Sequence, residues 1–215
     1  MSDLSRRLVV VPMKDPALSK TRLAPALTRD QRDAFARSLF LRTLDLLKDI
    51  RCRVGADRFD IAVVTASAAV RRIAGDQGVA TIAEDPDQGL NDALLTAARF
   101  AARTGYGSLC VLPADLGSPD RRELQSLLVH PAKPHRVIAC PSMDLGTNAL
   151  VVAPPDALSF AFGPRSFVRH MRAADALGLD PKMLPLESLK WDIDSTDDLA
   201  RLLDADPRIA ETWIG

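Results

Sequence analysis

Short apolar runs alternate along this chain with longer segments whose apolar positions recur at helical spacing. The runs are rich in Val, Leu, Ile and Ala and predict strands buried in a sheet, at residues 8–11, 59–64, 80–83, 109–112, 137–140 and 149–153. The longer segments predict helices at 29–48, 68–75, 91–103, 121–128, 167–177 and 196–203. This alternation predicts an α/β fold: a single domain over residues 1–215, with three α/β/α layers and a mostly parallel, Rossmann-like mixed sheet.

Polar residues at two helix starts support these boundaries. Thr28 precedes the first predicted helix as an N-cap, and the segment Ser195-Thr-Asp-Asp198 resembles a capping box with Asp in place of Glu. No apolar run approaches the ~18 residues of a membrane span. The run at 8–11 is too short for a signal sequence and is broken by Pro12 and Lys14, so we expect it to be the first strand of a cytoplasmic protein.

The composition of the chain indicates which kinds of binding partner are unfavourable. Lys plus Arg and Asp plus Glu both number 28, and the net charge of zero argues against nucleic acid or a membrane surface as the main partner. The three cysteines have no metal-binding spacing, and their odd number suits a reducing compartment. The histidines, His130, His135 and His170, also lack metal spacing, and each is expected to be a surface residue. There is no P-loop, dinucleotide-binding or G-x-S-x-G motif.

An aspartate follows the predicted strand at 109–112. Asp115 is either a solvated turn residue or a carboxylate at the C-terminal edge of the sheet, where open α/β sheets bind ligands. Further along, Asp192 and Asp194 alternate with Ile193 in an extended piece before the last helix, so their side chains point to the same side. Each acid alone has an ordinary structural explanation. Together they supply hard oxygen ligands of the kind that Mg²⁺ shares with phosphates.

A long polar loop follows the first predicted strand and carries Lys14, Lys20 and Arg22. One interpretation is a solvated loop whose cations cover apolar surface with their stems. The other is a cradle for a triphosphate, in which the cations and backbone N–H groups bind phosphate oxygens. Spacing alone gives the two equal weight.

Three further segments carry polar groups next to glycine. In EDPDQGLNDAL (84–94), Gly89 allows close approach to a flat ligand, and Asn91 can donate and accept hydrogen bonds as a base or ribose requires; the alternative is a helix start with Asn91 as N-cap. The segment Gly146-Thr147-Asn148 opens a strand with two polar side chains. In Gly163-Pro-Arg165-Ser166 a helix begins, and helix N-termini favour anions, although Ser166 also suits an ordinary N-cap.

Taken together and in order, these segments resemble one enzyme family over nearly the whole chain. VPMK, KTRLA, QGLN, PADL, GTNAL, FGPRSF and DIDSTDDL are similar to motifs of the 2-phospho-L-lactate, phosphoenolpyruvate and 3-phosphoglycerate guanylyltransferases of coenzyme F-420 biosynthesis. GTNAL followed by FGxxSF is the most specific part. The resemblance implies a nucleotide-diphospho-sugar transferase-like fold (glycosyltransferase-A-like), GTP and a three-carbon phospho-acid as substrates, release of pyrophosphate, and Mg²⁺ as cofactor.

The resemblance also implies roles for individual residues. The expected metal ligands are Asp115 and Asp194, with Asp192 as the alternative to Asp194. The residues expected to bind the nucleotide are Lys14, Lys20 and Arg22 at the triphosphate and Gln88, Gly89 and Asn91 near guanine and ribose. The residues expected to hold the phospho-acid are Thr147, Gly163 and Ser166. Charge stabilisation during transfer is expected from Asp115, Lys20, Arg22 and Asp194.

This chain departs from the family pattern at two positions. Gly117 stands where relatives usually have Pro after PADL, and Leu145 stands where many have a second glycine, next to the expected acceptor pocket. Two alternatives remain open: another sugar-phosphate or molybdopterin nucleotidyltransferase of the same fold, and a non-catalytic nucleotide-binding module. The sequence is compatible with a homodimer but does not specify the oligomeric state, the phospho-acid, or GTP over ATP.

Overall fold

The computed structural model describes residues 6–131 and 133–213. The strands are β1 (Arg7–Pro12), β2 (Phe59–Thr65), β3 (Ala80–Ala83), β4 (Ser108–Val111), β5 (Arg136–Pro141), β6 (Thr147–Ala153) and β7 (Asp180–Met183). The α-helices are α1 (Arg29–Val54), α2 (Ala68–Asp76), α3 (Leu90–Arg103), α4 (Arg121–Leu128), α5 (Ser166–Ala176) and α6 (Thr196–Ala205). Short 3₁₀ helices are η1 (Pro16–Leu18), η2 (Thr21–Leu23), η3 (Glu187–Leu189) and η4 (Pro207–Thr212). Every predicted strand and helix is present.

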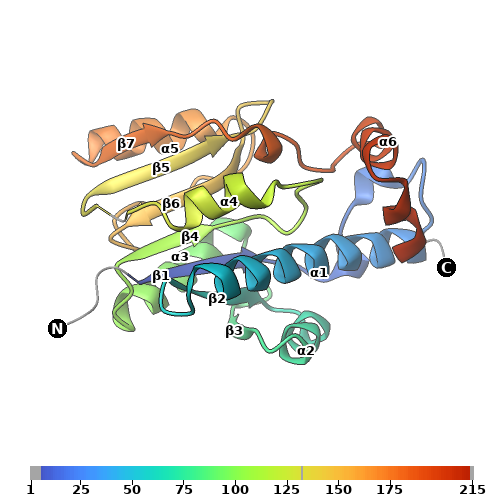
Figure 1. Cartoon of the computed structure of the whole chain (residues 1–215), viewed down its shortest axis with the longest axis horizontal. Helices are drawn as coiled ribbons and strands as arrows, with labels where there is room; N and C mark the ends of the chain where they lie inside the picture. The colour runs from blue at the N-terminus through green and yellow to red at the C-terminus, as the bar shows by residue number, and fades with distance from the viewer. Residues whose placement is uncertain (1–5, 132, 214–215) are drawn as a thin grey trace.

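The strands form one seven-stranded sheet in the order β3-β2-β1-β4-β6-β5-β7 (Figure 1). Only β6 runs against the others, pairing antiparallel with β4 and β5. The predicted mostly parallel mixed sheet is therefore confirmed. Strand β7 was not predicted, because its sequence DPKM is polar and contains a proline. Such a strand is tolerated at the edge of the sheet, where it pairs only with β5.

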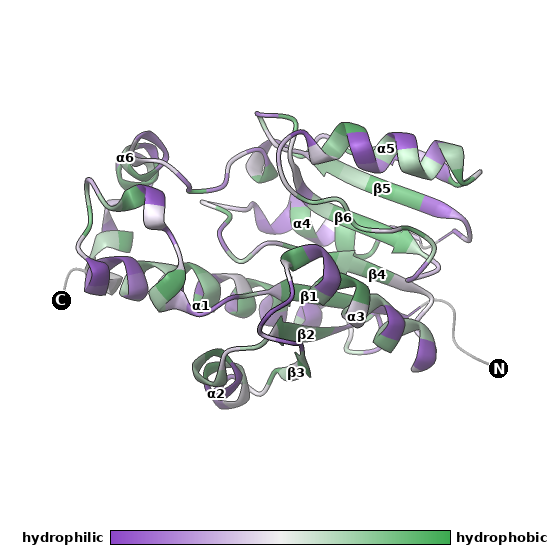
Figure 2. Cartoon of the chain, turned by 180° about the vertical axis from the view of Figure 1, so that it is seen from behind, coloured by the Kyte–Doolittle hydropathy of each residue, from purple (hydrophilic) through white to green (hydrophobic). Residues whose placement is uncertain are grey.

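Helices cover both faces of the sheet and bury its alternating side chains. In β1, Val9 and Val11 join a core cluster with residues of α1, α2 and α4, whereas Leu8 and Val10 join a second cluster with residues of α3 and α5. Because both faces are buried there, the central strands β1, β4 and β6 are almost continuously hydrophobic (Figure 2). This arrangement confirms the three-layer α/β/α architecture.

A third core cluster fixes the C-terminal part of the chain beside the start of α1. Phe35 packs edge-to-face on Trp213 with 5.2 Å between ring centroids, and Ile193 and Leu199 belong to the same cluster. Helix α6 begins with the predicted capping box of Ser195 and Asp198. The predicted N-cap of α1, Thr28, is confirmed, and together with Gln31 it forms a second capping box. The segment that carries Asp192 and Asp194 is therefore anchored directly before α6.

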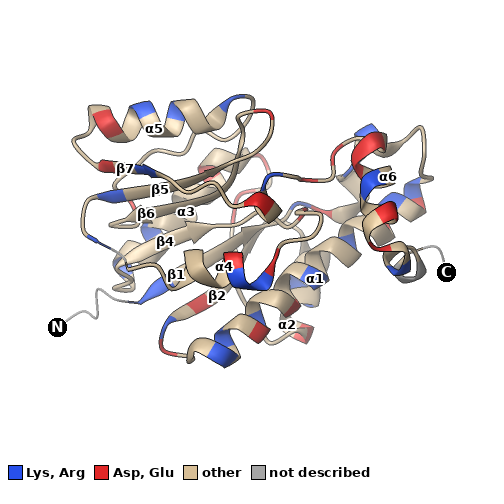
Figure 3. Cartoon of the chain, turned by 45° about the horizontal axis from the view of Figure 1, so that its top comes forward, with Lys and Arg blue, Asp and Glu red and all other residues tan. Residues whose placement is uncertain are grey.

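The surface carries both charge signs. Figure 3 shows acidic and basic residues on the same helices, in keeping with the net charge of zero. Within the described residues, none of the helices combines the length and hydrophobicity that crossing a membrane would need. The described cysteines are all free, with Cys110 and Cys140 buried in the core.

A buried arginine ties the sheet to α4. Arg7 is only 2% exposed, and its guanidinium donates hydrogen bonds to Ser108 Oγ at 3.0 Å and to the carbonyls of Leu127, Leu128 and His130 at 2.7, 2.7 and 2.8 Å. These carbonyls lie at the C-terminal end of α4, where a helix leaves its last carbonyls without helical partners. Arg7, at the start of β1, therefore supplies hydrogen-bond donors to carbonyls at the C-terminal end of α4.

Replacing this guanidinium with an apolar side chain is expected to destabilise the fold. Arg7→Met leaves several buried acceptors unpaired, so the free energy of unfolding in urea should fall by about 3 kcal/mol. The matched control is Arg6→Met, because the half-exposed Arg6 makes a surface ion pair with Asp60 and a contact with the Tyr106 ring, and its loss should cost about 1 kcal/mol or less. Equal losses in the two variants would contradict this account of Arg7.

Candidate functional site

The candidate site lies at the edge of the sheet where the parallel strands end. Asp115 follows β4, and the loop holding Lys14 and Lys20 follows β1. Because β6 runs in the opposite direction, its first residue, Thr147, starts at this same edge. The sequence expectation that Asp115 lies at the C-terminal edge of the sheet is therefore confirmed.

Backbone pairing brings the PADL and DID segments together. Leu116 forms an isolated antiparallel bridge with Asp192, and the N–H of Ile193 donates to the carbonyl of Asp115 at 3.1 Å. Ile193 points into the third core cluster, which leaves Asp192 and Asp194 on the opposite side of the extended segment. Main-chain hydrogen bonds thus hold acids from distant parts of the sequence side by side.

Gly117 permits this close approach. Its N–H donates to the carbonyl of Trp191 at 3.2 Å, and a Cβ at this position would lie only 2.8 Å from Ile193 Cδ1. A larger residue here requires the Ile193 side chain to move. The departure from the family pattern at Gly117 therefore has a local packing explanation.

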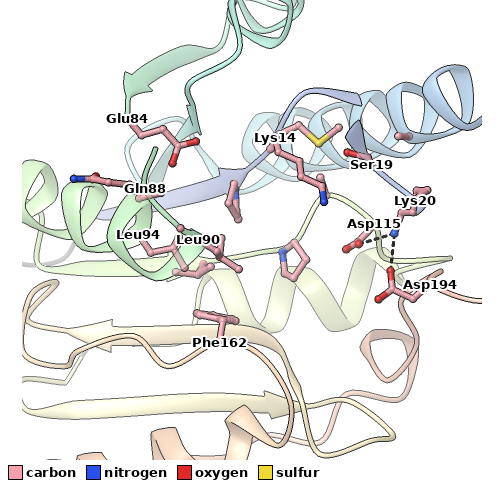
Figure 4. Close-up of a pocket in the computed structure, with 18 residues that line it drawn as sticks. Lys14, Ser19, Lys20, Glu84, Gln88, Leu90, Leu94, Asp115, Phe162 and Asp194 are labelled. Atoms are coloured by element: carbon pink, nitrogen blue, oxygen red, sulfur yellow. Dashed lines mark hydrogen bonds and ion pairs between the residues drawn. The ribbon is translucent and has the colours of Figure 1, made fainter. Parts of the chain in front are cut away.

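Lys20 bridges the two carboxylates. Its Nζ lies 2.7 Å from Asp115 Oδ2 and 3.0 Å from Asp194 Oδ1 (Figure 4). The Lys20 side chain is 6% exposed, whereas Arg22, 3.6 Å from Asp194, is 79% exposed. Burial alone would lower the pKa of Lys20, but the charges of Asp115 and Asp194 outweigh it, so its pKa lies above the ordinary value. Lys20 is therefore a buried cation held between two acids.

Asp192 adds a third carboxyl group beside this pair. Burial, and then the charges of Asp115 and Asp194, raise its pKa to about 6. Among residues 6–131 and 133–213, no three acidic, cysteine or histidine side chains form a ready-made metal site. The cluster therefore offers two carboxyl groups that share the Lys20 ammonium group, and a third, Asp192, whose ionisation is disfavoured.

A cavity of about 570 Å³ opens beside the cluster. Its charged and polar lining residues are Lys14, Ser19, Lys20, Glu84, Gln88, Asp115 and Asp194. Leu90, Leu94 and Phe162 supply apolar walls (Figure 4). Of the residues expected to bind nucleotide, Lys14, Lys20, Gln88 and Gly89 thus line one cavity, and the volume suits a ligand of nucleotide size.

Two of the expected nucleotide residues do not line this cavity. Arg22 lies on the surface, next to Asp194. The amide of Asn91 is bonded to the main chain of Phe162: Oδ1 accepts from its N–H at 2.7 Å, and Nδ2 donates to its carbonyl at 3.4 Å. The N-cap of α3 is Gly89, so the alternative of Asn91 as N-cap is wrong. Asn91 therefore holds the main chain of Phe162, whose side chain lines the cavity.

The expected acceptor residues meet outside this cavity, around a buried histidine. Ser166 Oγ lies 3.0 Å from Thr147 Oγ1, and Thr147 Oγ1 lies 3.1 Å from His170 Nδ1. The N–H of Ala161 donates to His170 Nε2 at 2.9 Å. Nε2 must therefore carry the lone pair, and in the neutral ring Nδ1 carries the proton and donates to Thr147. Gly163, in the loop just before α5, has a φ of +125°, a conformation that suits glycine.

His170 corrects a sequence expectation. It was expected to be a surface residue, but its side chain is fully buried, whereas His135 is exposed. A signal was available, because Ser166, His170 and Ala174 recur at helical spacing and form the buried face of α5. Burial, and then the charge of Arg169, lower the pKa of His170 to about 4, so the ring is neutral at pH 7.

Leu145, the second departure from the family pattern, adopts a φ of +66°. This left-handed conformation favours glycine, and a leucine there costs about 1–2 kcal/mol. The carbonyl of Leu145 accepts from the N–H of Phe167 at 3.1 Å, which links the loop to the start of α5. The need for this backbone conformation explains why a glycine suits the position.

The buried neutral His170 should make the fold sensitive to acid. The unfolded ring binds a proton below its ordinary pKa of 6.5, while the folded ring stays neutral to about 4, so stability falls as the pH decreases through this window. Between about pH 7 and pH 4.5, the wild type should lose on the order of 2 kcal/mol more unfolding free energy than His170→Asn in urea. The exposed His135→Asn should behave as wild type; equal pH dependence in His170→Asn would contradict this prediction.

Comparison with known proteins gives relatives over most of the chain. The sequence model of a family described as "Guanylyl transferase CofC like" matches residues 7–206. The chain is 38% identical to a 3-phospho-D-glycerate guanylyltransferase of Colwellia psychrerythraea, covering 92% of this chain and 91% of that protein. It is 35% identical to a phosphoenolpyruvate guanylyltransferase of Rubrobacter xylanophilus (90% and 91% covered) and 26% identical to a 2-phospho-L-lactate guanylyltransferase of Methanothermobacter thermautotrophicus (90% and 82%).

Solved structures share the fold at low sequence identity. A putative nucleotide-diphospho-sugar transferase from Desulfovibrio desulfuricans aligns with a TM-score of 0.71 at 16% identity, covering 97% of this chain and 92% of that one. A nucleotidyl transferase from Methanothermobacter aligns with a TM-score of 0.64 at 16% identity, covering 95% and 98%. The expected nucleotide-diphospho-sugar transferase-like fold is therefore confirmed.

Proposed function

This chain belongs to the CofC-like guanylyl transferase family, and we propose that it transfers GMP from GTP to a three-carbon phospho-acid in coenzyme F-420 biosynthesis. The acids are those in the names of its relatives: 3-phospho-D-glycerate, phosphoenolpyruvate and 2-phospho-L-lactate. The observation that carries the proposal is the cluster of Lys20, Asp115 and Asp194 at one end of a nucleotide-sized cavity.

The cluster fits a divalent cation shared with substrate. Mg²⁺ in nucleotide enzymes takes one or two protein carboxylates and fills its other positions with water and phosphate oxygens. Asp115 and Asp194 already share one cation, the Lys20 ammonium, which shows that both carboxylates face the same small space. We propose that they hold Mg²⁺. When bound, the ion would neutralise charge on the reacting phosphates. Asp192 is the less suitable ligand, because its ionisation is disfavoured.

The reaction requires positioning and charge neutralisation. A phosphate oxygen of the acceptor attacks the α-phosphorus of GTP in line, the bond from that phosphorus to the bridging oxygen breaks, and pyrophosphate leaves. The acceptor phosphate is already ionised near neutral pH, so no protein general base is needed. Two anions must approach each other, and their repulsion is large in a poorly hydrated site. Lys14 and Lys20, which line the cavity, offset this repulsion.

The proposed acceptors can be tested in one competition. Purified protein with GTP, Mg²⁺ and equal amounts of the three acids should release pyrophosphate, and mass spectrometry should detect one guanylylated acid as the main product. Absence of pyrophosphate release with every acid would reject the proposed function.

The carboxylate of Asp115 should be essential in this reaction. Asp115→Asn keeps the size of the side chain but removes its charge, so turnover should fall ~10²-fold or more, as is typical for loss of one charge-stabilising group. Asp197→Asn, an exposed acid in the first turn of α6, is the matched control and should retain turnover. Near-normal turnover of Asp115→Asn would reject the assignment.

Lys20 should compete with the divalent cation for the two acids. Without nucleotide, the ammonium neutralises Asp115 and Asp194, so Lys20→Met should bind Mn²⁺ about tenfold more tightly than wild type, as measured by electron paramagnetic resonance of free Mn²⁺. Lys14→Met is the control, because Lys14 lines the cavity without a described ion pair to either acid. Unchanged or weaker Mn²⁺ binding by Lys20→Met would contradict the shared site.

A further inference from the structure

Glu84 lies at the opposite end of the cavity from the carboxylate cluster. It follows β3 directly, and Figure 4 shows Glu84 and Gln88 at one end, with Lys20, Asp115 and Asp194 at the other. If the α-phosphate of a nucleotide lies beside the cluster, its base extends toward Glu84. In that orientation Glu84 would lie beside the base of the nucleotide.

The carboxylate of Glu84 is held in a fixed orientation. Its Oε1 accepts the backbone N–H of Ala66 at 3.0 Å, which ties it to the loop after β2. A carboxylate has about four acceptor positions, so this single bond leaves most of its capacity for a ligand. Among the described residues no lysine or arginine forms an ion pair with Glu84, and burial raises its pKa. Glu84 is a half-buried, preoriented acceptor facing the cavity.

The surrounding walls favour a flat ring with donors on one edge. Leu90, Leu94 and Phe162 provide the apolar surface of the same cavity. Guanine carries two adjacent donors, N1–H and the 2-amino group, which match the two acceptor directions of a carboxylate. Adenine instead carries an acceptor at N1, whose lone pair would face the negative carboxylate. The chemistry of this end of the cavity thus distinguishes guanine from adenine.

We propose that Glu84 is a specificity-determining residue that selects guanine by accepting hydrogen bonds from N1–H and the 2-amino group of the base. This inference rests on the proposed function, because it takes the phosphates to lie at the Asp115 and Asp194 end. A purely structural role, in which Glu84 only orders the Ala66 loop, would affect every nucleotide equally. The ratio of activities with different bases therefore separates the two roles.

The test compares GTP, inosine triphosphate and ATP in the wild type and in Glu84→Gln. In the wild type, kcat/KM should fall about tenfold from GTP to inosine triphosphate, which lacks only the 2-amino group, and further to ATP. In Glu84→Gln, kcat/KM for GTP should fall about tenfold or more while that for ATP stays constant or rises. Asp87→Asn, an exposed acid in the same turn that does not line the cavity, should keep the wild-type ratio.

Equilibrium binding of the same nucleotides separates this inference from the proposed function. Wild-type protein that binds GTP and inosine triphosphate equally, or a Glu84→Gln variant that keeps the GTP to ATP ratio, would overturn the role of Glu84 even if guanylyl transfer is observed. Selective loss of GTP binding in Glu84→Gln would support it even if none of the three acids is the acceptor. If Glu84→Gln folds poorly, the comparison of GTP and inosine triphosphate binding by the wild-type protein still tests the role of Glu84.

Discussion

The site depends on the ion pairs that Lys20 makes with Asp115 and Asp194. Carboxylates brought this close repel each other, and a cation between them removes that repulsion. The main chain sets the arrangement: the bridge between Leu116 and Asp192 fixes the distance between the two acid-bearing segments. Main-chain pairing therefore holds the two carboxylates on either side of one buried ammonium group.

The sheet explains how one edge collects both halves of the site. Lys20 and Asp115 lie in the loops that follow the parallel strands β1 and β4. Thr147 lies at the same edge because it is the first residue of β6, which runs in the opposite direction. A strand in the usual direction would place Thr147 at the opposite edge. The cavity beside Lys20 and Asp115 has the carboxylate cluster at one end and a separate acid, Glu84, at the other.

Much of this could be predicted from the sequence, because apolar runs and caps are local signals. The strands themselves follow from those runs, the position of Asp115 from the end of the run at 109–112, and that of Asp194 from the alternating Asp-Ile-Asp pattern before the last helix. Properties that depend on tertiary contacts were not predictable in the same way. Strand β7 is polar and exists through pairing with β5. The burial of His170, the bonding of Asn91 to Phe162, and Lys20 lying between two acids all depend on partners distant in sequence. The sequence gives no separate signal for Glu84, because an acid shortly before a helix is common and only the cavity sets this one apart.

The most direct measurement is a crystal structure with a non-hydrolysable GTP analogue and Mn²⁺, in which anomalous scattering locates the metal. The account predicts a metal peak in contact with both Asp115 and Asp194 and with the nucleotide phosphates, and Lys20 shifted from the acids to phosphate oxygens. A metal bound away from these carboxylates, with Lys20 still bridging them while the phosphates lie elsewhere, would contradict it.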